Sequence, residues 1–469
     1  ARCTKDKLPS YFVLSQLFQA QGKVVDAYGT CSSILTQLGE TIPDSVDYEV
    51  VGAMIPETLR KYDEVYCDDW LGKKMEDYTL RYVIRFYLQM SQAAFFSKAP
   101  HIVAYFFCKV AQLSLENGVC QHTPQVFLQL SHIIMRSGNN IACAHRIAKD
   151  AMALSERFNL SDQMTQLSLI FTNAVGHLEW FHAGVQRLRV CFDSALSSGN
   201  AEMGFFCALQ LVNRSILSGE KELTSLLKEI DYYLHLLETY KSEVSKNYLL
   251  SSRETVSMLI DKGEATSIEA KEHLGDANDP GNKFMEMFYY QQVLRNFWLG
   301  YGERCRHFAQ KGFARIPQGK YFFHIIKFYY GLSLLEMLKK KSNYVRFKEV
   351  EEIIESMKVA VKHADSNIRN KLELLQAELH GLGARHNHNE AVALYNAAIA
   401  SAKKSKFIHE QGLACERAGL YYKKMGCARD ALVHFQQAHA CYKEWGSSVK
   451  VGAIQRELDG FNSIGTNFI

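Results

Sequence analysis

The stretch MGCARDALVHFQQAHACYKEW, residues 425–445, places two small residues on either side of one aromatic residue. Ala431, Phe435 and Ala438 are separated by four and then three positions, so on an α-helix they share one face. A small residue lets a neighbouring helix approach closely, and the aromatic residue fills the space beside the crossing. The pattern therefore predicts two antiparallel helices in close contact, with Gly426 in the turn between them.

The same arrangement occurs three times in the chain. Within 412–445 the further template positions are Gly419, Tyr422 and Gly426. Within 372–405 the matching residues are Ala391, Tyr395 and Ala398, and within 8–34 they are Ser15, Phe18, Gly22, Ala27, Cys31 and Ile34. The spacing resembles that of the tetratricopeptide repeat, a helical hairpin of about 34 residues. Stacked hairpins of this kind form a solenoid.

Between these copies the helical period continues without the full template. Runs such as RYVIRFYLQMSQAAFF, PQVFLQLSHIIMRSGN and GFFCALQLVNRSILSG are amphipathic and end at Gly, Asn or Pro. The chain has only 7 prolines in 469 residues, which is typical of helices because proline breaks their interior. We therefore expect an all-α protein, an α-α superhelix of roughly 20–26 helices.

Two segments interrupt the pattern. Residues 40–69 are acidic, contain two prolines and keep no repeat spacing. Residues 262–283 are polar and rich in Gly, Asp and Asn. The second segment predicts a linker between an N-terminal repeat half, 1–261, and a C-terminal half, 284–469. A mobile loop inside one continuous solenoid explains the same composition equally well.

Composition and charge argue against several classes of function. The net charge of +4 over 469 residues gives no electrostatic footprint for nucleic acid. No apolar run reaches the length of a membrane span. The 12 cysteines are scattered singly, with no C-x-x-C pair, which indicates free thiols in a reducing, cytoplasmic setting.

The N-terminal region carries a more specific resemblance. An A-x-G-K sequence at 20–23 is followed by Leu71, Met75 and Asp77, then by SKAPHIVAYFFCKVAQLSLENGVCQHTPQVF and AHRIAKDAMALSERF. This succession resembles the tetratricopeptide-type helical region of large multidomain STAND-type signalling ATPases and kinases. The resemblance implies a sensor, scaffold or oligomerisation arm, with catalysis in other domains. A start without Met or signal peptide is expected of an internal piece of such a chain.

The sequence offers no set of residues for catalysis or for a cofactor. Gly22-Lys23, Gly72-Lys73 and Gly319-Lys320 lack the remaining positions of a phosphate-binding loop. His380, His386 and His388 cluster in one segment, but a zinc site needs three or four ligands at a recognisable spacing. We therefore expect no catalytic residue, no metal and no cofactor, and a protein that is not an enzyme.

Recognition of a protein partner, or of neighbouring domains of the same polypeptide, is the function that remains. In such arrays the first helix of each hairpin lines a curved groove, which suits an amphipathic helix or an extended peptide. The groove positions in the last two repeats are Glu373, Gln376, His380, Gly383, Ala384, Leu413, Glu416, Leu420, Lys423 and Lys424. Two alternatives stay open: a structural subunit of a large assembly, and a small-molecule-sensing or enzymatic pocket within the superhelix.

Overall fold

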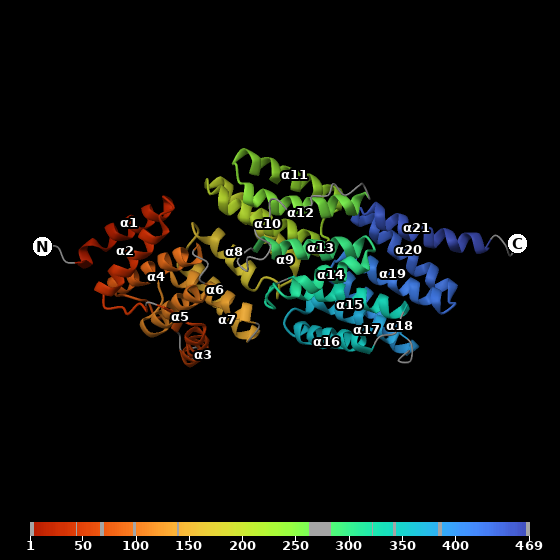
Figure 1. Ribbon diagram of the computed structural model, residues 1–469, viewed down its shortest axis with the longest axis horizontal. Coiled ribbons are helices and arrows are strands. Elements are labelled where there is room, and N and C mark those ends of the chain that lie inside the picture. Colours follow the sequence, from red (N-terminus) through yellow and green to blue (C-terminus); the bar gives the residue numbers. More distant parts are fainter. Residues whose placement is uncertain are drawn as a thin grey trace. The chain divides into compact units, whose positions relative to one another are not determined.

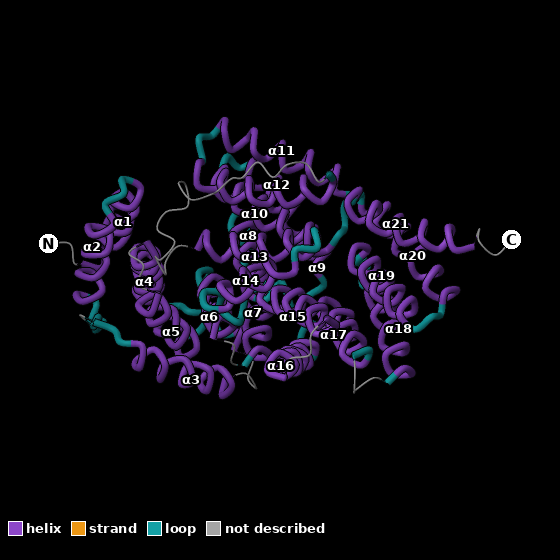
Figure 2. Tube along the Cα trace, turned by 45° about the vertical axis from the view of Figure 1, so that its right-hand side comes forward, coloured by secondary structure: helices purple, strands orange, loops and turns teal. Residues whose placement is uncertain are grey.

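A computed structural model describes residues 4–43, 45–65, 70–96, 100–137, 140–261, 283–320, 322–340, 344–382 and 387–465. Within these ranges the chain forms 21 α-helices and two short 3₁₀-helices, and no strand (Figures 1 and 2). The prediction of an all-α helical-repeat superhelix is confirmed, since helices adjacent in sequence pack in pairs. The chain divides into two compact units, residues 1–175 and 176–469.

The first unit consists of eight α-helices. They are α1 (Leu8–Ala20), α2 (Val24–Gln37), α3 (Tyr48–Val65), α4 (Tyr78–Phe96), α5 (Pro100–Asn117), α6 (Thr123–Ser137), α7 (Ile141–Arg157) and α8 (Met164–Ala174), with 3₁₀-helices at Thr4–Lys7 and Trp70–Gly72. The predicted hairpin at 8–34 is α1–α2, where Ala27, Cys31 and Ile34 are buried. Residues 40–69 were expected to interrupt the array, but α3 occupies much of that segment and packs on α5.

The second unit contains thirteen α-helices. They are α9 (Phe181–Ser197), α10 (Ala201–Ser218), α11 (Leu223–Thr239), α12 (Glu243–Ile260), α13 (Lys283–Trp298), α14 (Gly302–Phe313), α15 (Phe323–Lys340), α16 (Tyr344–Val361), α17 (Asp365–His380), α18 (His388–Lys404), α19 (Ile408–Lys424), α20 (Ala428–Trp445) and α21 (Ser448–Gly465). The predicted repeats at 372–405 and 412–445 fall on the hairpins α17–α18 and α19–α20. Their template residues Ala391, Tyr395, Ala431 and Phe435 are all buried.

One row of helices in this unit, which we call the inner row, is α10, α12, α13, α15, α17 and α19, each packed on the next. Stretches of the inner-row helices α10 and α15 are buried on all sides: every residue from 211 to 219 and from 328 to 335 is buried. An outer helix such as α20 buries only one face, at Ala431, Phe435, Ala438 and the last turn. The sequence shows the same contrast, because α15 is apolar all round whereas α20 is amphipathic.

The inner row contains one pair of sequence neighbours, α12 and α13, that run parallel. Gln291 Nε2 donates to Ser252 Oγ at 3.1 Å, and Arg295 pairs with Glu254 at 2.5 Å, so residue numbers rise together along both helices. Before this pair the second helix of each hairpin lies in the inner row, and after it the first helix does. Residues 262–282 of the predicted linker 262–283 lie outside the described residues, and the helices on either side belong to one unit. The boundary proposed there stays a prediction.

Segments of the second unit that are far apart in sequence also touch. The Trp180 indole Nε1 donates to Ser405 O at 2.9 Å, and Ser447 Oγ donates to Leu259 O at 2.7 Å. In an open solenoid each repeat contacts only its neighbours. The second unit therefore curls far enough for the start of α9 to reach the end of α18, and for α12 to reach the start of α21.

Candidate partner-binding surfaces

The predicted groove residues lie on α17 and α19, both in the inner row. Leu413 is 1% exposed and belongs to the core, so its side chain does not line an open surface. Glu416 accepts hydrogen bonds from Tyr442 Oη at 2.5 Å and Lys450 Nζ at 2.9 Å, which places α20 and α21 over it. Burial alone would raise the pKa of Glu416, but the charges of Lys450 and Arg417 and these hydrogen bonds hold the pKa below its ordinary value.

The other predicted positions are only partly available. Glu373, Gln376, His380 and Leu420 are half-buried, and Gly383 and Ala384 lie outside the described residues. Lys423 is exposed and pairs with Glu457 of α21 at 2.6 Å, while Lys424 is exposed at the end of α19. These residues do not share one open trough, because the unit's own helices cover the middle of α19. Their role in partner binding stays a prediction.

The interior behind these positions holds a buried ion pair. Lys371 Nζ and Asn370 Nδ2 both lie 2.6 Å from Glu410 Oε2, and none of the three side chains is more than 4% exposed. Burial lowers the pKa of Lys371 in spite of the opposing effect of Glu410. Lys371 Nζ also donates to Asn367 O at 2.7 Å. A pair so deeply enclosed offers no access to a ligand, and we assign it the role of fixing how α17 and α19 meet.

A second charged cluster joins α15, α17 and α19. Glu378, which is 1% exposed, pairs with Lys339 at 2.5 Å and accepts a hydrogen bond from Tyr395 Oη at 2.9 Å. Arg417 of α19 pairs with Glu336 of α15 at 3.2 Å. In each ion pair the two residues belong to different hairpins. These contacts therefore fix how the hairpins that begin with α15, α17 and α19 are aligned along one another.

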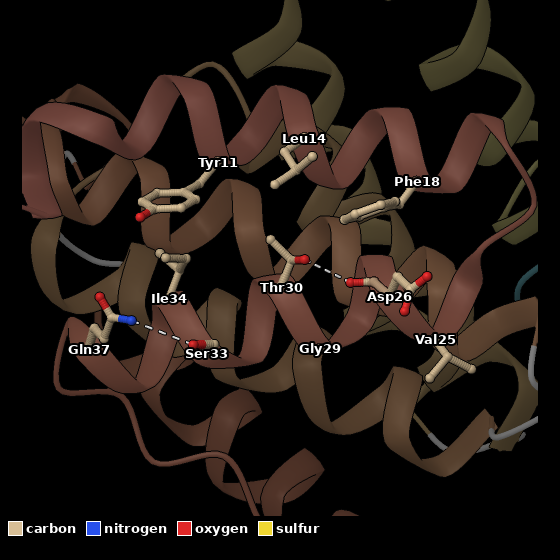
Figure 3. Close-up of a pocket in the computed structure, with 10 residues that line it drawn as sticks. All are labelled: Tyr11, Leu14, Phe18, Val25, Asp26, Gly29, Thr30, Ser33, Ile34 and Gln37. Carbon is tan, nitrogen blue, oxygen red and sulfur yellow. Dashed lines mark hydrogen bonds between the residues drawn. The ribbon is translucent and has the colours of Figure 1, made fainter.

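The first unit has an open groove between α1 and α2, with a volume of about 690 Å³. Figure 3 shows Tyr11, Leu14 and Phe18 of α1 pointing toward Thr30 and Ile34 of α2. Its other lining residues are Val25, Asp26, Gly29, Ser33 and Gln37. A Cβ added at Gly29 would meet no atom within 4 Å, so the missing side chain helps to keep the groove open.

Apolar side chains are unusually exposed on this hairpin. Val25 is 84% exposed and Leu14 is 37% exposed, and next to them on α1 Val13 and Leu17 are 62% and 50% exposed. The repeat template placed Ser15, Phe18 and Ala27 but gave no sign of this outer stripe. Helical spacing places these apolar residues on one face, but it identifies that face as exposed only when the face that packs on the rest of the protein is already known.

A second cavity, of about 670 Å³, lies between α12, α13 and α14. Four of its lining residues, Gln292, Arg295, Asn296 and Leu299, follow the i, i+3, i+4, i+7 spacing of one helix face. The sequence analysis missed them, although a polar stripe on the otherwise apolar and aromatic helix α13 was a visible signal.

The described residues show whether the histidines could hold a metal ion and whether any helix could span a membrane. His388 Nδ1 lies 2.9 Å from Tyr421 Oη, His380 is half-buried, and His386 lies outside the described residues. In the part of the chain that the structure describes, no three His, Cys, Asp or Glu side chains are grouped as a metal ion would require. Nor does any helix there combine the length and the hydropathy of a membrane span.

Comparison with known proteins adds little. No protein-family model and no curated protein matches the chain. Among solved structures, one match is described as a "Circular tandem repeat protein with novel repeat topology and enhanced subunit contact surfaces". It is 14% identical, covers 98% of this chain and 96% of that chain, and has a TM-score of 0.14. A superposition at that score carries no argument about this chain.

Proposed function

We propose that this chain is a non-catalytic helical-repeat scaffold that binds an amphipathic helix of a protein partner in the α1–α2 groove. The observation that carries the proposal is the exposure of Leu14 and Val25 along a groove of about 690 Å³. Contiguous exposed apolar side chains rimmed by polar ones mark interaction sites. Asp26 and Gln37 supply polar groups at the rim.

A helix is the occupant that the fold favours. In a helical-repeat array each hairpin packs one of its faces against the helices of the next hairpin, so such a face is shaped to receive a helix. An amphipathic helix laid in a groove recurs in peptide recognition, with apolar anchors one turn apart. In keeping with the resemblance at the N-terminal region, we place this scaffold in the regulatory part of a larger signalling ATPase or kinase, in the cytoplasm.

The test changes the apolar wall without touching the core. A Leu14→Glu and Val25→Glu variant replaces two exposed side chains, so circular dichroism and the melting temperature are expected to stay close to those of the parent chain. Partners cross-linked to the parent in cells are purified and their binding to the purified chain is measured. We expect the double variant to bind at least about tenfold more weakly, since apolar anchors dominate such interfaces.

The matched control moves the same change to another exposed apolar position. Val190 of α9 is 69% exposed and belongs to the second unit, so Val190→Glu is expected to bind as the parent does. Equal binding by the parent and the Leu14→Glu, Val25→Glu variant would overturn the proposal. So would a robust enzymatic turnover by the purified chain that is lost on substitution of a single Cys or His.

A further inference from the structure

The cavity between α12, α13 and α14 has a polar floor in an apolar neighbourhood. Gln292 and Asn296 are 8% and 5% exposed, and both side chains line the cavity. Around them α13 buries Tyr290, Val293 and Leu294. Two carboxamides on a buried helix cost free energy unless their hydrogen-bonding groups are satisfied.

The hydrogen bonds inside the chain satisfy only half of this carboxamide pair. Asn296 Nδ2 donates to Gln292 O at 2.7 Å and to Gln292 Oε1 at 3.3 Å, so the two carboxamides are held side by side. Within the described residues, no other hydrogen bond is formed by either side chain. Gln292 Nε2 is left as a donor and Asn296 Oδ1 is left as an acceptor, on two side chains that both line the cavity.

The nearest charge in the cavity wall is already compensated. Arg295 pairs with Glu254 at 2.5 Å, and its Nη1 also lies 3.9 Å from Met258 Sδ. This guanidinium is therefore held by α12 and is not set up to attract an anion. The remaining wall next to the carboxamides includes the apolar side chains of Met258, Leu299 and Phe308. Beside the carboxamides a ligand therefore meets a neutral donor–acceptor edge and apolar side chains, and polar residues at 301, 303, 304 and 307 complete the lining.

We propose that this cavity binds a small planar heterocycle that carries a lactam edge, an N–H beside a C=O, as in uracil or hypoxanthine. The ligand carbonyl accepts from Gln292 Nε2, and the ligand N–H donates to Asn296 Oδ1. The ring lies against Met258, Leu299 and Phe308. A volume of about 670 Å³ is within the range of small-molecule sites. This site is separate from the α1–α2 groove and does not depend on the proposed scaffold function.

The experiment uses matched ligands on the full chain. Uridine and inosine are titrated in ligand-observed saturation-transfer NMR, beside 3-methyluridine and 1-methylinosine, in which a methyl group replaces the lactam hydrogen. We expect saturable binding of uridine, inosine or both. Each methylated partner is expected to bind about tenfold more weakly, the loss of one buried hydrogen bond plus a steric clash.

Variants of the chain test the same contacts from the other side. Gln292→Leu and Asn296→Leu are each expected to weaken binding by about tenfold for the same reason. Leu299→Trp fills the cavity from its wall and is expected to abolish binding while leaving both carboxamides in place. Lys311→Gln, at an exposed position of α14 that does not line the cavity, is expected to leave affinity within about twofold. Circular dichroism and melting temperature confirm that each variant is folded.

Three results overturn the inference. The first is the absence of saturable binding of both nucleosides to the parent chain at millimolar concentration. The second is equal binding of a nucleoside and its methylated partner, because the lactam edge would then not be recognised. The third is unchanged affinity in a folded Leu299→Trp variant, which would place the binding elsewhere.

Discussion

Gly419 and Phe435 meet where α19 crosses α20. A Cβ added at Gly419 would lie 2.8 Å from the Phe435 ring, closer than side chains pack. Gly419→Val is therefore expected to overpack the crossing and to lower the free energy of unfolding by about 1–3 kcal/mol. Urea unfolding followed by circular dichroism measures the change.

A second glycine in the same unit provides the control. A Cβ at Gly452 of α21 would meet only Arg456, at an ordinary 3.9 Å. Gly452→Val is expected to change stability by less than about 0.5 kcal/mol, as at a surface site. Equal effects of the two substitutions would mean that α19 and α20 do not cross at Gly419.

Buried histidines predict a loss of stability in acid. Burial, with a smaller effect of Lys327, lowers the pKa of His324 from 6.5 to about 4. Below pH 6.5 the unfolded chain binds a proton at this position and the folded chain does not, so stability falls as the pH drops from 6.5 toward 4. A difference of one pKa unit corresponds to about 1.4 kcal/mol. His324 alone is therefore expected to lower the free energy of unfolding by about 3 kcal/mol when the pH falls below about 4.

The measurement compares the urea midpoint at about pH 7.5, 6 and 5 in three proteins. His324 Nδ1 is buried without a hydrogen bond, so His324→Phe is expected to keep the fold and to make the acid loss smaller. His235 is exposed, and His235→Gln is expected to leave the pH dependence as in the parent. A His324→Phe variant with the parent's full acid loss would contradict the assignment.

At this scale the sequence predicted packing better than it predicted exposure. Ala391, Tyr395 and Ala398 were expected at a helix crossing and are buried there. Leu413 and Glu416 were expected in an open groove, but one is in the core and the other is bonded to α20 and α21. Repeat spacing identifies the face that meets the partner helix of the same hairpin. It does not identify what covers the opposite face.

Among the elements, the parallel pair α12 and α13 could not be read from the sequence. Each helix has its own clear period, but the direction in which two helices pack depends on contacts such as Gln291 with Ser252. Composition singled out the polar segment 262–283 as a boundary or a loop, and this stays a prediction. Composition alone could not distinguish a boundary between units from a connection within one. The two compact units divide at residue 175.

The parallel pair makes a prediction about chain length. A connection between neighbouring parallel helices must return roughly the length of α12, whose 18 residues span about 27 Å. Replacing residues 262–282 by four glycines leaves a reach of at most about 18 Å, so α12 and α13 cannot keep their pairing. We expect a loss of cooperative melting in that variant, measured by circular dichroism.

A flexible segment of unchanged length is the control for this deletion. Twenty-one Gly and Ser residues have a mean end-to-end distance of about 25 Å, which is close to the required span. That variant is expected to melt within a few degrees of the parent. If the four-glycine chain melted like the parent, the parallel arrangement of α12 and α13 would be wrong.

For the whole second unit, one buried side chain of α17 ties this helix to the start of α9. Asn367 of α17 donates to His177 O at 2.9 Å and to Glu179 O at 2.5 Å, and its Oδ1 accepts from Phe181 N at 3.1 Å. These partners lie 186 to 190 residues away in sequence. A repeat array held only by neighbouring contacts has no such bond, so the curled arrangement is open to a direct test.

Asn367→Ala leaves three backbone groups without this partner and is expected to lower the free energy of unfolding by about 2–5 kcal/mol. Hydrogen–deuterium exchange is expected to rise both near 177–181 and in α17, because each of these two segments loses its hydrogen bonds to the other. Asn396→Ala, at an exposed position of α18, is expected to change neither stability nor exchange outside its own turn. Faster exchange confined to α17 would mean that residues 177–181 are held independently of this helix.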